Sequence, residues 1–336
     1  MSETTMRAVL ASGGVAIDDP AALRDGEAPM PELRPRDVLV RVQAVSVNPV
    51  DTKVRGRMQA GDAPKILGFD AVGTVEAAGE QVRTLSVGER VWYAGDVTRP
   101  GSNAELQAVD ERIVAPAPRS LSDGDAAALP LCAITAWESL FDRLRLGPDS
   151  SGTLLVLAAA GGVGSILIQL ARQLTPGLRV IATASRPESE RWATELGAHA
   201  VVDHHDLVAQ TRAVAPDGID YIFSPHSQGN EDAFAELLRP FGHIVAIDDP
   251  EQIAVRTFKP KAITWHWEFM FARSTYETDD MAQQQEILRR VADLVDRGAV
   301  RSTATETIQD FSAAGIRRAY ELVLSGRMIG KAVVTR

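Results

Sequence analysis

The sequence is poor in cysteine, in long apolar runs and in positive charge, and each shortage excludes a class of protein. Its 336 residues include one cysteine, Cys132, which excludes internal disulfide bonds and metal centres built from several thiolates. No stretch approaches about 18 consecutive apolar residues, so we expect no transmembrane helix. The N-terminus lacks the basic start and apolar core of a secretory signal. We therefore expect a cytoplasmic protein.

Charge and length narrow the prediction further. The formal net charge is −10, and Lys and Arg are scattered along the chain. A nucleic-acid groove or an anionic-membrane surface needs a basic face, so neither partner is expected. Apolar residues make up 45% of the chain and charged residues 24%, as in ordinary folded proteins. The length exceeds what one core usually serves, which predicts two lobes.

The first 125 or so residues have the pattern of short strands broken by Gly, Pro and Asp. Residues 37–48 alternate apolar and polar side chains, as a half-buried strand does. Residues 66–96 repeat this pattern, with glycines at the expected bends. This part of the chain predicts a compact antiparallel barrel or sandwich.

From Leu129 onwards, apolar runs alternate with helical stretches. The runs are 153–159, 179–185, 200–203, 219–224 and 243–248. Apolar runs joined by crossover helices predict a parallel sheet that is covered on both faces. Residues 262–271 would extend this sheet at an edge. An amphipathic helix over 279–298 and a final strand that rejoins the first lobe complete the chain.

The stretch VLAAAGGVGSILIQLARQL, residues 156–174, predicts a dinucleotide site. It fits the pattern A-x-G-x-x-G at Ala159, Gly161 and Gly164. The first small residue allows a tight turn, the second lets the backbone approach a pyrophosphate, and the third lets helix and strand pack closely. A helix that begins near Gly162 and Val163 offers unpaired N–H groups to the phosphates. The preceding strand and the following helix supply the context that this motif requires.

The end of the next strand indicates which dinucleotide is bound. A carboxylate about 20 residues after the motif would bind the adenosine ribose of NADH. Here the segment TASRPE presents Ser185 and Arg186, with no acid before Glu188. A hydroxyl and a guanidinium suit a ribose phosphate, so NADPH is preferred. The alternative is that Arg186 is a surface arginine in a loop.

Several segments together resemble a known family. AAGGVGSILIQLAR, SVNPVDTKVRG (46–56) and GFDAVGTV (68–75) resemble the medium-chain dehydrogenase/reductase superfamily, in particular its zinc-independent quinone oxidoreductase branch. HWEFMFARS (266–274), VADLVDRG (291–298) and SGRMIGKAVV (325–334) are similar to the subgroup called zinc-type alcohol dehydrogenase-like proteins.

The resemblance implies an α/β fold with two domains. A GroES-like β-barrel catalytic domain would span residues 1–127 and be completed by 275–336. A Rossmann domain, a doubly wound parallel sheet that binds NADPH, would span 128–274, with the active site in the cleft. The resemblance also implies reduction of quinones or α,β-unsaturated carbonyls by hydride transfer from NADPH, usually in a homodimer.

The positions that hold zinc in relatives carry different residues here. Asn48 stands at the first position, Phe69 replaces the histidine of a Gly-His-Glu motif, and Cys132 falls on the third. One thiolate cannot build a tetrahedral site, so we expect no metal and a buried, inert Cys132. The pair His204 and His205 shows no evident third ligand. His204 instead matches a position where related reductases place an aromatic residue beside the adenosine phosphate, or it is a solvated loop histidine.

Catalysis without zinc needs placement and a donor for the developing oxyanion. Asn48 can donate its amide N–H, although it is also a residue in a turn before proline. Lys53 would polarise an oxygen or pass a proton through water, or it is a solvated surface lysine. Tyr93 would line the cleft, or it is a core residue. Asp51 is expected to tie the turn together by accepting backbone N–H bonds.

Three further residues are expected at the cofactor. The segment HWEFMF would fold over the nicotinamide, with backbone groups near Phe269 and Phe271 holding the carboxamide. That segment would also serve as an edge strand at a dimer interface. Ser224, at the end of the run 219–224, is the third residue expected at the cofactor. Phe69 makes the pocket more apolar, which suits a flat quinone or an alkenal.

The leading hypothesis is a metal-independent NADPH oxidoreductase that reduces quinones or activated carbon–carbon double bonds. One alternative is an enoyl-thioester reductase, which would need a long groove and a basic site for a carrier phosphate. Another is a non-catalytic NADPH-binding redox sensor. A zinc alcohol dehydrogenase is the third, and the residues at positions 48 and 69 argue against it.

Overall fold

The structure is a computed structural model that describes residues 5–336, and it divides into two compact units. The first unit comprises Met1–Ile134 and Phe271–Arg336, and the second comprises Thr135–Met270. The sequence placed these boundaries at 127 and 274. In the structure, the first boundary lies between Ile134 and Thr135, within helix α3 (Pro130–Trp137). No change of composition interrupts this continuous helix.

The first unit is built on a mixed seven-stranded sheet. Its path runs β15 (Ala304–Ile308), β16 (Lys331–Thr335), β3 (Asp37–Ser46), β5 (Ala71–Ala78), β6 (Arg90–Tyr93) and β8 (Val114–Pro116), and β7 (Leu106–Asp110) pairs with β3 off this path. Strand β16 pairs antiparallel with β3, which confirms that the end of the chain returns to the first lobe.

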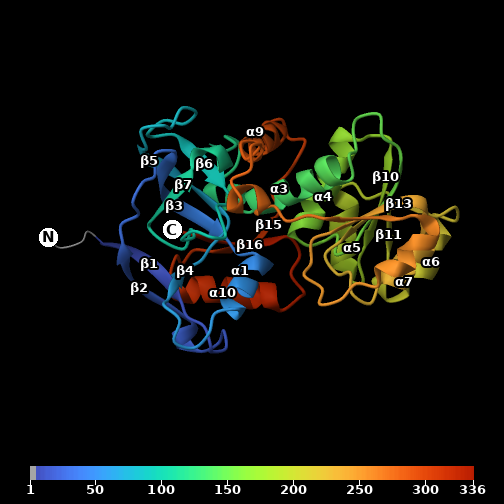
Figure 1. Cartoon of the computed structure of the whole chain (residues 1–336), viewed down its shortest axis with the longest axis horizontal. Helices are drawn as coiled ribbons and strands as arrows, with labels where there is room; N and C mark the ends of the chain where they lie inside the picture. Colours follow the sequence, from blue (N-terminus) through green and yellow to red (C-terminus); the bar gives the residue numbers. More distant parts are fainter. Residues whose placement is uncertain (1–4) are drawn as a thin grey trace. The chain divides into compact units, whose positions relative to one another are not determined.

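A second, three-stranded sheet has the order β2 (Leu23–Pro29), β1 (Thr5–Ala11) and β4 (Lys65–Ile66). Over residues 5–336 the pairing of the two sheets does not close into a barrel, so the expected barrel is realised as open sheets around a large apolar core and a smaller apolar cluster. The helical segments of this unit are η1 (Pro20–Ala22), α1 (Pro49–Gly56), η2 (Glu111–Ile113), α2 (Asp123–Ala127), α3, α8 (Ala272–Thr275), α9 (Gln283–Asp296) and α10 (Ala313–Leu324). Helices α1 and α10 lie against each other (Figure 1).

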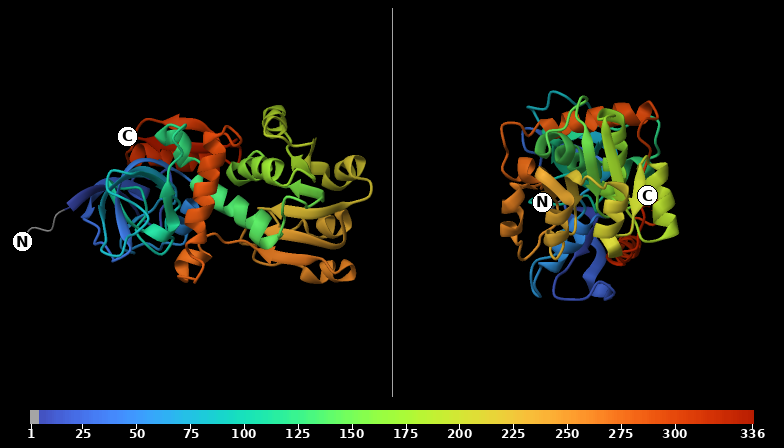
Figure 2. Two further views of the ribbon diagram at one scale, coloured as in Figure 1. Left: turned by 90° about the horizontal axis from the view of Figure 1, so that it is seen from above. Right: turned by 90° about the vertical axis from the view of Figure 1, so that its right-hand side faces the viewer.

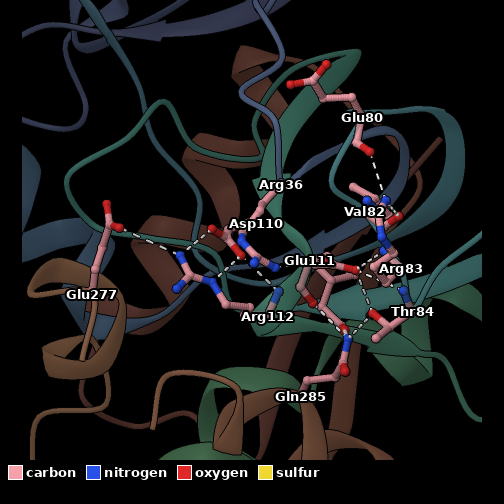
Figure 3. Close-up of polar contacts among 11 residues, drawn as sticks. Arg36, Glu80, Val82, Arg83, Thr84, Asp110, Glu111, Arg112, Glu277 and Gln285 are labelled. Carbon is pink, nitrogen blue, oxygen red and sulfur yellow. Dashed lines mark hydrogen bonds and ion pairs between the residues drawn. The ribbon is translucent and has the colours of Figure 1, made fainter. Parts of the chain in front are cut away.

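A buried polar network around Glu111 ties helix α9 to the N-terminal strands of the same unit (Figure 3). Glu111, which is 3% exposed, accepts hydrogen bonds from the backbone N–H of Arg83 at 2.8 Å and of Thr84 at 2.9 Å. Gln285 of α9 donates to the carbonyl oxygens of Glu111 at 2.8 Å and Val114 at 2.7 Å. Buried polar groups are costly unless they are paired, so these contacts fix where the C-terminal segment attaches.

The second unit is a six-stranded parallel sheet. Its strands, in spatial order, are β11 (Ala200–Val202), β10 (Leu178–Thr183), β9 (Gly152–Val156), β12 (Ile219–Ser224), β13 (Leu238–Ala246) and β14 (Thr264–Trp267). Counted along the chain this is the order 3-2-1-4-5-6 of the doubly wound dinucleotide-binding fold. The predicted α/β fold with a Rossmann sheet is confirmed, and β14 forms the expected edge.

Helices join and cover the strands of this sheet (Figure 2). They are the π-helical η3 (Glu138–Arg143), α4 (Gly162–Leu174), α5 (Pro187–Glu195), η4 (His204–Asp206), α6 (Leu207–Val214), α7 (Glu231–Leu237) and η5 (Val255–Lys261). The central strands are almost fully buried, as their continuous apolar sequences predict. In the part of the chain that the structure describes, no helix combines the length and apolar character needed to cross a membrane.

Candidate functional site

The small-residue turn between β9 and α4 has the close packing that the motif predicts. A Cβ atom at Gly164 would lie 2.7 Å from the carbonyl oxygen of Ala158 and 2.8 Å from the Cα of Ala159. Those are backbone atoms that cannot move aside, so only glycine fits. At Gly161 the nearest atom, the same Ala158 oxygen, would be 3.3 Å away. Gly164, the third small residue of the motif, is therefore the one that allows helix α4 to pack closely against β9.

The N-terminus of α4 presents a row of backbone donors. Gly162 is its first residue, and the N–H of Ser165 makes the first bond of the helix ladder, to the carbonyl of Gly161 at 2.9 Å. The N–H groups of Gly162, Val163 and Gly164 precede that bond. Such N–H groups, at the positive end of the helix dipole, form a site for a phosphate anion.

The residues expected at the adenosine end follow two neighbouring strands. Thr183 of β10 pairs with Val202 of β11, so Ser185 and His204 both lie just beyond the carboxyl edge of the sheet. The Arg186 guanidinium is partly exposed and forms an ion pair with Glu188 at 3.2 Å. A ribose phosphate would therefore compete with Glu188 for Arg186.

The two neighbouring histidines have a third potential ligand that the sequence did not reveal. Ligand atoms of Asp203, His204 and His205 lie within 4.8 Å of one another. The His204 and His205 rings are 4.2 Å apart, and both side chains are exposed. Because the three are consecutive at the start of the 3-10 turn η4, with Asp203 as its N-cap, their proximity follows from chain connectivity.

The hydroxyl of Ser224 is held inside the second unit. It lies 3.0 Å from the hydroxyl oxygen of Ser227, and its own oxygen accepts from the N–H of His226 at 3.2 Å. Ser227 is in turn bound by Asp248, beyond the end of β13, with its N–H 2.6 Å and its Oγ 2.8 Å from that carboxylate. Ser224 thus links the carboxyl ends of two adjacent strands.

In the first unit, five groups form what we call the buried polar cluster: the side chains of Ser46, Asn48, Asp70 and Lys331, and the N–H of Leu131. One Asp70 oxygen accepts from Asn48 Nδ2 at 2.7 Å and from Ser46 Oγ at 3.1 Å. The other accepts from the N–H of Leu131 at 2.7 Å. The Lys331 ammonium lies 3.5 Å from Asp70 and donates to the side-chain oxygen of Asn48.

Burial and the neighbouring groups act on the Asp70 carboxyl in opposite directions. Burial raises the pKa of Asp70 above its ordinary value, although the Lys331 charge and the hydrogen bonds from Asn48, Leu131 and Ser46 act to lower it. The groups that bond to this carboxyl are donors, and donors stabilise the ionised form. Burial also raises the pKa of the Cys132 thiol to about 12, so the free cysteine is a neutral thiol, as expected of a buried one.

A hydrogen bond from its own backbone fixes the turn that presents Asn48. The Asp51 carboxylate accepts the backbone N–H of Asn48 at 2.7 Å, which confirms the expected role of Asp51. Lys53 is exposed on the same helix, α1. Tyr93, on β6, is 1% exposed within the apolar core of the first unit, and burial raises its pKa. Over residues 5–336 its hydroxyl has no hydrogen-bond partner.

The segment after β14 contains Phe269 and Phe271, and one of them contacts Phe69. Phe271 is buried and packs edge-on against Phe69, with ring centroids 5.5 Å apart and planes at 73°. Phe269, by contrast, is 49% exposed. The two residues expected at the nicotinamide therefore lie in different environments, and Phe69 is part of an aromatic pair.

Comparisons with known proteins define the family. The model described as "Alcohol dehydrogenase GroES-like domain" matches residues 34–119, and "Zinc-binding dehydrogenase" matches 196–334. A zinc-type alcohol dehydrogenase-like protein of Staphylococcus aureus is 41% identical over 310 residues, covering 89% of this chain and 90% of the relative. A 2-methylene-furan-3-one reductase of Solanum lycopersicum is 35% identical over 229 residues, covering 65% and 56%.

A solved structure from Rhizobium etli, named as a zinc-dependent alcohol dehydrogenase, superimposes with a TM-score of 0.95. It is 43% identical, and the match covers 99% of both chains. The fold and these matches define a medium-chain oxidoreductase. The chain belongs to the zinc-type alcohol dehydrogenase-like family of that superfamily.

The family descriptions imply zinc, and the buried polar cluster does not fit that metal. Phe69 offers no ligand atom, and Cys132 is the single cysteine of the chain. The Lys331 ammonium already places a positive charge against Asn48 and Asp70. A catalytic zinc needs three protein ligands in tetrahedral arrangement. We therefore derive no step through zinc.

Sequence reasoning missed the residues that complete the cluster. Asp70, Ser46 and Lys331 all lie in segments that the sequence analysis uses only for the family resemblance. The available signal was a lysine at the start of the apolar strand KAVVT, where a buried charge requires an acidic partner.

Proposed function

We propose that the protein is a metal-independent, NADPH-dependent reductase of α,β-unsaturated carbonyls or quinones. The observation that carries the proposal is the glycine turn on a 3-2-1-4-5-6 sheet, where a side chain at Gly164 would collide with the backbone. That turn is built for a dinucleotide. The 35% identity to a reductase of a conjugated ketone supports the substrate class.

NADPH is favoured over NADH by the groups beyond β10. The segment offers the Ser185 hydroxyl and the Arg186 guanidinium, and it has no carboxylate before Glu188 to bind a free ribose. Arginine binds phosphate with two charge-assisted hydrogen bonds. The N–H groups at the start of α4 suit the pyrophosphate. In this proposal the exposed His204 borders the adenosine phosphate.

Bound NADPH would supply a hydride to the electrophilic carbon of the substrate, and solvent would supply the proton. The chain's part is to place the substrate and to stabilise the oxygen that gains negative charge. Asn48 is the donor for that oxygen, and the Phe69–Phe271 pair forms an apolar wall. Lys53 and Tyr93 are the second choices for a group near the substrate.

The test is NADPH oxidation by purified protein after chelator treatment, with a quinone, an alkenal, an enone and a simple aldehyde. We expect turnover of the first three without metal. Activity with the aldehyde alone, restored by zinc, would contradict the proposal. Tight NADPH binding without turnover of any acceptor would instead identify a redox sensor.

Replacing Arg186 with alanine should separate the two cofactors. The change removes hydrogen bonds to a charged phosphate, so we expect NADPH affinity to fall by about 1.5–3 kcal/mol, roughly 10- to 100-fold, with little effect on NADH. Titration calorimetry with both cofactors measures this. The matched control is Glu188→Gln, which frees Arg186 from its ion pair and should tighten NADPH binding. Equal losses for both cofactors would disprove the assignment.

A further inference from the structure

Lys331 is a buried lysine whose position is set by the backbone. It is 3% exposed and begins β16, and its N–H donates to the carbonyl of Thr303 at 2.8 Å. Gly330, just before it, has a φ of +62°, and a Cβ there would lie 2.3 Å from the Thr303 oxygen. Only glycine allows this approach, and it directs Lys331 into the polar cluster.

The three ammonium hydrogens of Lys331 have three acceptors. They are the carbonyl oxygen of Val47 at 2.8 Å, the side-chain oxygen of Asn48, and Asp70 at 3.5 Å. An ammonium group can only donate, so the atom of Asn48 that faces it must be the oxygen. The Asn48 nitrogen therefore faces Asp70, which accepts one of its two hydrogens.

This arrangement leaves one N–H of Asn48 uncommitted. The carboxamide oxygen is held by Lys331, one N–H is held by Asp70, and the backbone N–H is held by Asp51. In the described part of the chain, no hydrogen-bond acceptor contacts the second side-chain N–H of Asn48. Asn48 is 1% exposed, so this donor lies inside the first unit and not on its surface.

The charge on Lys331 also changes how well that N–H donates. A cation at the carboxamide oxygen withdraws electron density from the nitrogen, and linked hydrogen bonds strengthen one another at low dielectric. The ammonium lies in a buried site, where solvent screens it little. Its effect reaches the substrate through Asn48 and not by contact.

We propose that Lys331 is a positioning residue: it fixes the Asn48 carboxamide and polarises it, so that the free N–H stabilises the substrate oxygen during hydride transfer. The proposal rests on the proposed reductase function. It assigns to a lysine of the chain the electrostatic role that a metal ion would otherwise have, and it predicts a substrate with a carbonyl oxygen conjugated to the carbon that is reduced.

The experiment compares wild-type protein with Lys331→Met and with the double variant Lys331→Met/Asp70→Asn. The double variant removes both buried charges, so it keeps the comparison possible if the single variant fails to fold. With an enone at saturating NADPH, we expect kcat to fall about 10- to 100-fold, as is typical when groups that orient a reacting residue are lost. The KM for the enone and the Kd for NADPH should change little.

A double-mutant cycle distinguishes polarisation from a structural role. Asn48→Ala should cost much less in the Lys331→Met/Asp70→Asn background than in wild type, because the donor is already weakened. Lys261→Met is the control, since Lys261 also donates to backbone carbonyls, those of Glu236 and Leu238, but in the other unit. It should retain wild-type kcat.

Two results would overturn the proposal alone: unchanged kcat in the double variant, or an equal cost of Asn48→Ala in both backgrounds. If wild-type protein reduces none of the acceptors, the proposed function fails, and this inference fails with it.

Discussion

Asn48→Ala is expected to lower the turnover of an enone by about 10²- to 10³-fold, while NADPH binding stays unchanged. This is the usual cost of removing one donor to a developing oxyanion. The effect should fall on kcat and on kcat/KM alike, because the interaction strengthens only as charge builds on the oxygen. Steady-state kinetics of the folded fraction, together with NADPH titration, measure it.

The control for this experiment lies in the same cluster. Ser46 also donates to Asp70, at 3.1 Å, and is equally buried, but its hydroxyl has no assigned contact with substrate. Ser46→Ala should lower the free energy of unfolding by about 1–3 kcal/mol, the cost of leaving a buried acceptor short of a partner, and retain most of the turnover. If the two variants lose turnover equally, Asn48 acts through stability and not as a donor.

The second unit was predictable from the sequence because its signals are local. The predicted run 219–224 coincides with β12. The predicted run 179–185 corresponds to β10, which begins one residue earlier, at Leu178, and ends two residues earlier, at Thr183. Apolar runs, crossover helices and a glycine turn each depend on neighbouring residues. Gly164 could be assigned a role because close helix–strand packing follows from the motif itself.

The first unit was less predictable because its site depends on distant pairing. Asn48 and Lys331 are 283 positions apart, and only the antiparallel pairing of β3 with β16 brings them together. No local pattern encodes that register. The same holds for sheet closure, since alternating strands are compatible with a barrel, a sandwich or the open sheets that form here.

Asp51 should make stability depend on pH in a direction opposite to that of most carboxyls. Burial, together with the nearby Asp70 charge, raises the pKa of Asp51 from 3.8 to about 7, against the lowering effects of the Asn48 N–H, the Lys331 charge and the Gly68 N–H. Between these values the folded protein keeps the proton and the unfolded chain releases it. This group's contribution is therefore complete below pH 4, declines as the pH rises, and is lost above about pH 7.

Asp51→Asn should remove that decline, because the amide cannot ionise and its oxygen still accepts the Asn48 N–H. We expect the stability of wild type relative to this variant to drop by roughly 3 kcal/mol between pH 5 and pH 8. Urea unfolding of both proteins across this range gives the difference, in which the other titrating groups cancel. The exposed Asp18→Asn variant is the control for replacing a carboxylate by an amide. Parallel curves for wild type and Asp51→Asn would mean that Asp51 is already ionised in the folded protein at pH 5, held so by Lys331 and the two N–H groups.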